Sequence, residues 1–192
     1  MTVKGEATLF CKLLSDCRCR DDSGSPLDLD AGLQQCLELL QTISLRQAMV
    51  FVVGNGGSAA VASHLVNDLC NSGGVRAMTL HEPALLSCYS NDYGYEQAYG
   101  LLLERMAGSD DLLLAISSSG ESANIINAAN TMRKLGGRVV TFSGFGGENR
   151  LQRLGEINFW LDSAHFGSVE IGHLFLLHHL ADRLSNSGVG DE

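Results

Sequence analysis

The sequence is short of basic residues and proline, and it has no long hydrophobic run. Its 13 Lys and Arg are outnumbered by 22 Asp and Glu, which gives a net charge of -9. Proteins that grip nucleic acids by phosphate contacts need clustered basic residues, so the composition argues against a nucleic-acid partner. No apolar run approaches the roughly 20 residues of a membrane span, and the polar N-terminus does not resemble a secretory signal. We therefore expect a cytoplasmic protein without a membrane partner.

Only 2 prolines accompany 22 glycines, so many turns need a positive φ or a close approach of two backbones. The 6 cysteines lie mostly inside apolar helical patterns, and a chain of 192 residues can be stabilised by core burial, which indicates reduced thiols. Structural zinc sites usually place two to four residues between paired cysteines. Cys17-Arg18-Cys19 has a single intervening residue, so we assign it to the end of a helix.

Short apolar runs of strand length alternate with helical patterns along most of the chain. The expected strands are Met49–Val53, Ala77–Leu80, Leu112–Ile116, Val139–Phe142 and Ile157–Leu161. The expected helices are Ser58–Cys70, Tyr95–Met106, Ser122–Leu135 and Val169–Leu184. Such alternation predicts βαβ units around a parallel sheet covered on both faces. We expect an α/β fold, a three-layer α-β-α sandwich with a five-stranded parallel sheet of the flavodoxin-like kind.

The chain length predicts a single domain with additions at both ends. Residues 1–47 look helical in two pieces separated by a break at 22–26, and the apolar stripe of residues 29–45 suits an oligomer contact. Residues 48–184 form the expected α/β core, and residues 185–192 form the expected flexible tail.

Two strand-to-helix loops have the composition of anion sites. They read Val53-Gly54-Asn55-Gly56-Gly57-Ser58 and Ile116-Ser117-Ser118-Ser119-Gly120-Glu121-Ser122. Ligands of a parallel sheet bind beyond the carboxyl ends of the strands, where helix N-termini offer free N–H groups and a positive dipole end. Hydroxyls and amides of the second loop would cradle a phosphate without a lysine. Ser is also preferred as a simple helix cap, but two such loops in one sheet favour a phosphorylated ligand.

The first loop leaves a dinucleotide site as an alternative. Gly54-x-Gly56-x-x-Ala59 matches the looser dinucleotide fingerprint, with Glu82 as the residue for the ribose. However, Glu82 lies further along the chain than the usual ~20 residues. This alternative also leaves the serine-rich loop without a role.

Ionisable side chains gather on two of the expected helices. His64 and Asp68 are one helical turn apart, so they share one face. The C-terminal helix offers Glu170, His173, His178 and His179. Imidazole and carboxylate together suit zinc or another borderline divalent ion, and a polar face at an oligomer contact is the alternative. Glu170 lies roughly 12 Å from His178 along a regular helix, so the two meet on one ion only if the helix bends or a second subunit contributes a ligand.

Four blocks carry a resemblance to a known family. In chain order they are Gly54-Asn55-Gly56-Gly57-Ser58, His64, Asn91-Asp92-Tyr93-Gly94-Tyr95-Glu96 and Ser117-Ser118-Ser119-Gly120-Glu121-Ser122-Ala123-Asn124. In order and spacing these blocks resemble the sugar isomerase (SIS) domain family, and within it the phosphoheptose isomerases. The resemblance extends over nearly the whole chain, to about Leu184.

The resemblance implies a site for a phosphorylated sugar. The sugar contacts would be Asn55, Gly56, Gly57, Asn91 and Asp92. The phosphate would be held by Ser117, Ser118, Ser119 and Ser122. The same resemblance implies a homotetramer with sites near the subunit interfaces.

The resemblance also implies a divalent metal, Zn2+ or another ion. Its ligands would be His64, Asp68, Glu170 and His178, with Glu170 also close to the substrate. Asp68 and Glu170 stand where the family has Glu and Gln. Asp68 is one methylene shorter and reaches less far, whereas Glu170 adds a second carboxylate, which suits a harder ion such as manganese.

The expected reaction is an aldose–ketose isomerisation, from sedoheptulose 7-phosphate to D-glycero-D-manno-heptose 7-phosphate through a metal-assisted enediol. Asp68 would be the base and His178 the acid. The basic residues that the family carries after the first core helix are missing from Cys70-Asn71-Ser72, so a different phosphosugar stays open. Two alternatives are a non-catalytic adaptor, of the kind that associates with the bacterial replication initiator, and a phosphosugar sensor. The acidic residue at 68 and the histidine at 178 favour an enzyme.

Overall fold

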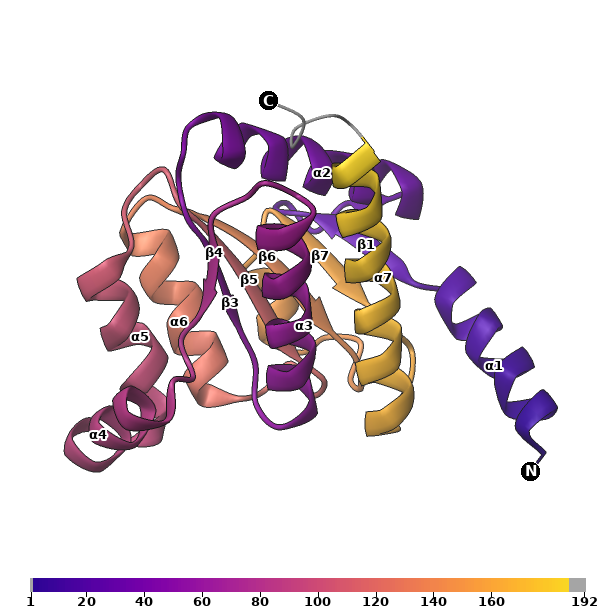
Figure 1. Cartoon of the computed structure of the whole chain (residues 1–192). Helices are drawn as coiled ribbons and strands as arrows, with labels where there is room; N and C mark the ends of the chain where they lie inside the picture. Colours follow the sequence, from indigo (N-terminus) through magenta and orange to yellow (C-terminus); the bar gives the residue numbers. More distant parts are fainter. Residues whose placement is uncertain (1, 187–192) are drawn as a thin grey trace.

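The computed structural model describes residues 2–186 and contains one mixed sheet of order β2-β1-β7-β6-β5-β3-β4 (Figure 1). Its parallel strands are β3 (Val50–Val53), β4 (Ala77–Thr79), β5 (Leu112–Ser117), β6 (Arg138–Ser143) and β7 (Ile157–Trp160). These match the five expected strands and follow the flavodoxin-like order. The α/β class and the parallel core are confirmed, but the sheet has 7 strands rather than five.

The two additional strands form an antiparallel hairpin on the β7 edge. β1 (Arg18–Asp21) pairs with β7, and β2 (Pro26–Leu27) pairs with β1. The assignment of Cys17–Cys19 to a helix end is therefore wrong. Cys19 is buried beside Gly32, where no Cβ occupies the space, and the break at 22–26 contains the hairpin turn between β1 and β2. A four-residue strand rich in charge carries no apolar run by which to recognise it.

Helices cover both faces of the sheet, which completes the three layers. One face is covered by α2 (Leu29–Leu45), α3 (Gly57–Asn71) and α7 (Phe166–Asn186). The other is covered by α5 (Tyr95–Met106) and α6 (Ala123–Lys134). Successive strand residues point to opposite faces. Accordingly, Val50 and Val52 join the core under α2, α3 and α7, while Phe51 and Val53 join the core under α5 and α6.

The N-terminal helix α1 (Val3–Ser15) buries none of its residues and projects from the body beside α7 (Figure 1). At the other end, α7 continues to Asn186, so Ser185 and Asn186 are helical rather than part of a flexible tail. The remainder of the expected tail, 187–192, lies outside the described residues. None of the helices in the described part of the chain has the length and hydropathy that crossing a bilayer requires.

One helix was not expected. α4 (Pro83–Tyr93) follows β4 and precedes α5. It has no fully buried residue, although Leu86 and Tyr89, three positions apart, pack partly buried against the core. Its start does carry a signal, because the Glu82 side chain accepts from the Leu85 amide and Pro83 occupies the first turn.

Candidate active site

The strand order brings the two candidate loops together at the carboxyl edge of the sheet. β3 and β5 are neighbours, but the helices that follow them, α3 and α6, cover opposite faces. The chain therefore diverges between these strands, and such a switch point forms a crevice in which α/β proteins bind ligands. The glycine loop after β3 (54–58) and the serine loop after β5 (117–122) both line this position. Ser58 and Ser118 link them, with 3.4 Å between their hydroxyl oxygens.

At the glycine loop, no side chain caps the first amides of α3. Gly56 has φ +54°, which an L side chain rarely adopts. Gly57 is required for a different reason. The carboxylate of Glu170 lies where a Cβ on Gly57 would be, so any larger residue there displaces it.

The serine loop is held in a defined conformation around Gly120. Ser117 donates to Ser122 across 3.1 Å, and the Ser119 hydroxyl accepts from the Glu121 amide across 3.1 Å. Ser122 is the N-cap of α6, but its side chain accepts no hydrogen bond from the first amides of the helix. Those amides therefore remain available to a bound anion. This arrangement offers hydroxyls and a helix N-terminus to one anion.

An ion pair holds the outer side of the serine loop. Arg150 donates through Nε to Glu121 across 2.7 Å, and its backbone amide donates to the same carboxylate across 2.9 Å. These hydrogen bonds lower the pKa of Glu121. Arg150 is therefore committed to the loop's own carboxylate, and the anion site relies on hydroxyls and amides.

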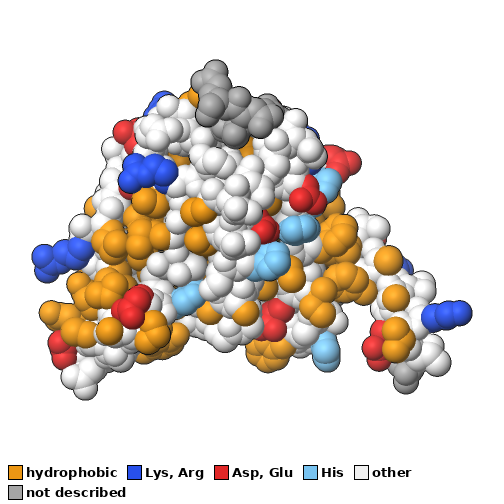
Figure 2. All heavy atoms as spheres, viewed as in Figure 1, with side chains coloured by type: hydrophobic (Ala, Val, Ile, Leu, Met, Phe, Trp, Pro, Cys, Tyr) orange, Lys and Arg blue, Asp and Glu red, His pale blue; other side chains and the backbone are white. Residues whose placement is uncertain are grey.

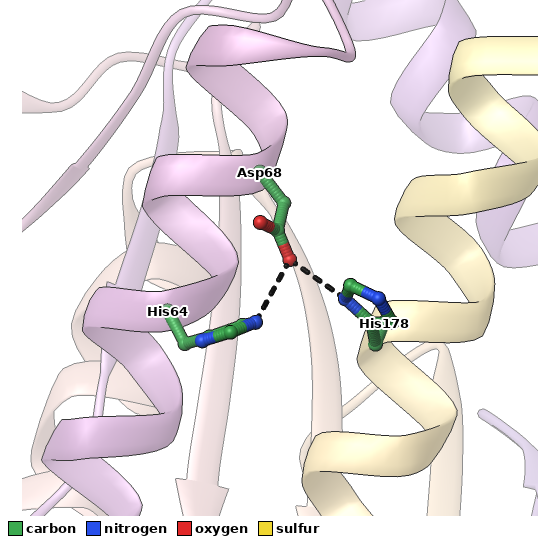
Figure 3. Close-up of side chains that lie close together, drawn as sticks. All are labelled: His64, Asp68 and His178. Atoms are coloured by element: carbon green, nitrogen blue, oxygen red, sulfur yellow. Dashed lines mark hydrogen bonds and ion pairs between the residues drawn. The ribbon is translucent and has the colours of Figure 1, made fainter.

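His64, Asp68 and His178 converge between α3 and α7 (Figure 3). Oδ2 of Asp68 lies 3.0 Å from Nδ1 of His178 and 3.3 Å from Nε2 of His64. The imidazole rings meet edge to face, with centroids 5.5 Å apart. The hydrogen bond to Asp68 raises the pKa of His178, and the nearby Asp182 carboxylate acts in the same direction.

The geometry of this cluster fits a divalent ion. The three ligand atoms all lie within 4.8 Å of one another. Two imidazoles and one carboxylate are a common zinc ligand set, and a site with three protein ligands keeps a position open for substrate or water. The Asp68 side chain is 16% exposed and the two histidines about half exposed, so the cluster is accessible. Figure 2 shows histidine side chains at the surface between α3 and α7.

Glu170 is not among the converging ligands in the described part of the chain. α7 is one continuous helix from Phe166, so Glu170 lies about two turns nearer its start than His178. Its carboxylate sits beside Gly57, at the positive end of α3. The structure thus brings Glu170 to the glycine loop rather than to the cluster, because the helix start does not bend.

The other histidines of α7 take different positions. His173 is fully buried and donates through Nε2 to the Ser143 carbonyl across 3.1 Å. Burial lowers its pKa to about 4, which keeps it neutral and away from the cluster. His179 lines an open pocket of about 460 Å³ together with His64 and His178, and Phe10 of α1 closes one side.

Asn91 and Asp92 lie on the exposed helix α4. Asn91 donates to Asp92 across 2.8 Å, and Cys88 contacts the other Asp92 oxygen at 3.6 Å, so both polar side chains bond within their own helix. Their predicted contact with substrate stays a prediction. Glu82 caps α4 and is thereby engaged, which argues against its use as a ribose ligand.

The buried cysteines do not form a thiolate metal site. All 6 cysteines are free, and burial raises the pKa of Cys17, Cys19 and Cys36 to about 12. They are neutral thiols packed in the core.

Two residues to which the sequence analysis gave no role, Tyr95 and Asn124, contact Asn55 of the glycine loop. Both residues lie inside the blocks that carry the family resemblance, which was the available signal for them.

Comparisons with known proteins agree with this arrangement. The SIS domain family model matches residues 28–144. The phosphoheptose isomerase of Edwardsiella ictaluri is 34% identical over 141 residues, which cover 71% of this chain and 72% of that protein. The phosphoheptose isomerase of Mycobacterium tuberculosis is 32% identical over 146 residues, covering 73% and 74%. The solved phosphoheptose isomerase of Francisella tularensis shares the fold, with a TM-score of 0.82 at 22% identity over 97% of this chain and 100% of that one. The chain therefore belongs to the SIS domain family and, within it, to the phosphoheptose isomerases.

Proposed function

We propose that this protein interconverts sedoheptulose 7-phosphate and D-glycero-D-manno-heptose 7-phosphate. The observation that carries the proposal is the pair of Asp68 and His178, 3.0 Å apart, in a fold whose serine loop offers hydroxyls and a helix N-terminus to an anion. The names of the curated relatives support the same reaction class, an aldose–ketose isomerisation. A non-catalytic adaptor or sensor has no need for this pair.

Isomerisation moves a proton between C1 and C2 of the sugar through an enediol. It needs a base near the carbons and an acid near the carbonyl oxygen. In this proposal Asp68 accepts the proton from carbon, and His178 supplies one to the carbonyl oxygen. In the protein without a metal ion, the hydrogen bond to Asp68 raises the pKa of His178, which favours the protonated imidazole.

The phosphate binds without a dedicated lysine. Its proposed partners are Ser117, Ser118, Ser119, Ser122 and the first amides of α6. Asn55, Gly56 and Gly57 contact the sugar from the glycine loop, and Glu170 lies at the same edge. Local dipoles and hydroxyls thus attract an anion to a chain whose net charge is -9.

His64, Asp68 and His178 would hold Zn2+ or another divalent ion. Such an ion, when bound, stabilises negative charge on the substrate oxygens. Without an ion, His64 and His178 hold the Asp68 carboxylate from its two sides. Asn91 and Asp92 would join the site through their helix, α4.

We further propose a cytoplasmic homotetramer. α1 buries none of its residues within its own chain, and Phe10 on α1 faces a pocket with the exposed Ile171 and Phe175 of α7. A second copy would cover this apolar face. Figure 2 shows hydrophobic side chains at the surface where α1 meets the body.

The function is tested by assaying formation of heptose 7-phosphate. Asp68→Asn and His178→Asn should each lower kcat by about 10²-fold or more, while sugar-phosphate binding persists in calorimetry. His165→Asn, which alters an exposed histidine before α7, is the matched control. Full turnover by Asp68→Asn or His178→Asn contradicts the assigned roles. Binding without turnover by the native protein indicates a sensor instead.

A further inference from the structure

The side chains of Asn55 and Asn124 form a reciprocal amide pair across the crevice. Nδ2 of Asn55 donates to Oδ1 of Asn124 across 2.9 Å, and Nδ2 of Asn124 donates to Oδ1 of Asn55 across 2.8 Å. Asn55 belongs to the glycine loop, whereas Asn124 lies in the first turn of α6. The pair therefore joins the loop proposed for the sugar to the helix whose start is proposed for the phosphate.

A third residue completes the hydrogen bonds of the Asn55 oxygen. The Tyr95 hydroxyl, at the start of α5, donates to Oδ1 of Asn55 across 2.7 Å. An amide oxygen has two lone pairs and an amide nitrogen two hydrogens. Both lone pairs of Oδ1 are thus engaged by Asn124 and Tyr95, whereas one of the two Nδ2 hydrogens of Asn55 remains after the bond to Asn124.

This count determines what Asn55 can offer a ligand. Its remaining capacity is a single N–H donor, because its acceptor sites are occupied. Asn124 is only 3% exposed, so its own amide is shielded from water, and the reciprocal pair fixes which end of the Asn55 amide faces the crevice. Without these partners, the amide of Asn55 could rotate to present either its oxygen or its nitrogen.

We propose that Asn124 and Tyr95 are positioning residues that hold Asn55 as a hydrogen-bond donor to an oxygen of the bound sugar. The inference rests on the proposed function for the nature of the ligand. A sugar carbonyl or hydroxyl oxygen accepts such a bond, and a bond to an oxygen that gains negative charge is stronger than a neutral one. The pair also holds the sugar loop at a fixed distance from the phosphate loop.

The test compares binding of inorganic phosphate with binding of sedoheptulose 7-phosphate by calorimetry, alongside kcat and KM. Tyr95→Phe removes one donor to Asn55 and keeps the ring, and Asn124→Leu removes the other at similar volume without adding a charge beside the phosphate site. Each should weaken sugar-phosphate binding about tenfold, the effect of one such hydrogen bond, and change phosphate binding by less than about twofold. Asn127→Ala is the matched control, since Asn127 lies one turn along α6 and donates to the Glu96 carbonyl instead.

The decisive readout is the combination with Asn55→Ala. Because Tyr95 is inferred to act through Asn55, Tyr95→Phe should have no further effect on sugar-phosphate binding in the Asn55→Ala background. Additive losses in that background, or equal losses for phosphate alone, overturn the inference. Unfolding temperatures identify variants that fail to fold, and Tyr95→Phe is the conservative case. Native protein that binds the sugar phosphate without turning it over refutes the proposed function but leaves this binding test intact.

Discussion

Oδ2 of Asp68 lies 3.0 Å from Nδ1 of His178, although 110 residues separate them in the chain. The same oxygen lies 3.3 Å from Nε2 of His64. One short carboxylate therefore contacts both imidazoles, because α3 and α7 pack side by side on one face of the sheet. The family's longer Glu is not needed for reach in this chain.

Lengthening that carboxylate should impair the site. In Asp68→Glu the charge is kept, but an additional methylene pushes the oxygen past the position where it contacts both rings. We expect kcat/KM to fall at least about tenfold, since misplacement of a reacting group by ~1 Å can cost up to 10²-fold. The same extension at Asp162, an exposed carboxylate paired with Arg18, is the control. Unchanged activity of Asp68→Glu would show that the distance is not critical.

The metal prediction can be checked without an activity assay. Purified protein should bind one Zn2+ per chain, measured by elemental analysis and by competition with a chelating dye. His64→Ala removes one of the three converging ligands and should weaken binding at least about tenfold. His165→Ala, outside the cluster, should not. Equal zinc content in His64→Ala and the native protein would place the ion elsewhere.

Substitution of Gly120 should disturb the serine loop. In Gly120→Ala the residue keeps φ +66°, and its new Cβ would overlap the side chain of Asn149. Asn149 is 3% exposed and donates to the Ser143 hydroxyl across 3.1 Å, so it has little room to move. We expect a loss of about 2 to 4 kcal/mol in the free energy of unfolding, together with weaker phosphate binding. Urea titration measures the first and calorimetry the second.

Gly146→Ala is the control for this change. A Cβ at Gly146 meets nothing within 4 Å, and its φ is not positive. Its effect on the free energy of unfolding should stay within about 0.5 kcal/mol. If both variants are equally stable, the serine loop does not depend on the conformation of Gly120.

His173 should make the protein less stable in acid. Burial lowers its pKa to about 4, from 6.5 in the unfolded chain. At neutral pH the His173 side chain is uncharged in both the folded and the unfolded chain. Below about pH 6.5 it binds a proton in the unfolded chain but not in the folded one. The loss of stability grows as the pH falls towards 4 and reaches about 3 kcal/mol.

Denaturant unfolding at a series of pH values measures this effect. In His173→Gln, which keeps an N–H donor for the Ser143 carbonyl but does not titrate, the difference in stability between pH 7.5 and pH 4.5 should be smaller. Identical pH profiles for the two proteins would mean that His173 does not contribute to acid sensitivity.

The sequence was sufficient for the parts of the fold that depend on apolar periodicity. Four of the five parallel strands were identified because residues buried on both faces form continuous apolar runs, as in Val50–Val53. The fifth, the edge strand Ala77–Thr79, is only half-buried and was identified from a shorter apolar run. β1 and α4 were missed for the opposite reason. The strand Arg18–Asp21 has one buried residue and α4 has none, so neither contains a continuous buried run, although Glu82 and Pro83 mark the start of α4.

The candidate site was likewise predictable from the sequence only in part. The spacing of His64 and Asp68 defines a helix face in any α-helix, and the structure brings His178 to that face. Glu170 could not be placed from sequence, because its position depends on whether α7 bends at its start. The contact between Asn55 and Asn124 spans 69 residues and follows from the switch in strand order rather than from a motif.

The hairpin at the β7 edge has a consequence for how copies of the chain meet. β2, the outermost strand on that side, begins with Pro26, which has no N–H to donate to a further strand. With only two residues in β2, the edge offers little to an incoming chain. Growth of the sheet by edge-to-edge addition, the first step of many aggregation routes, is therefore disfavoured on this side of the sheet.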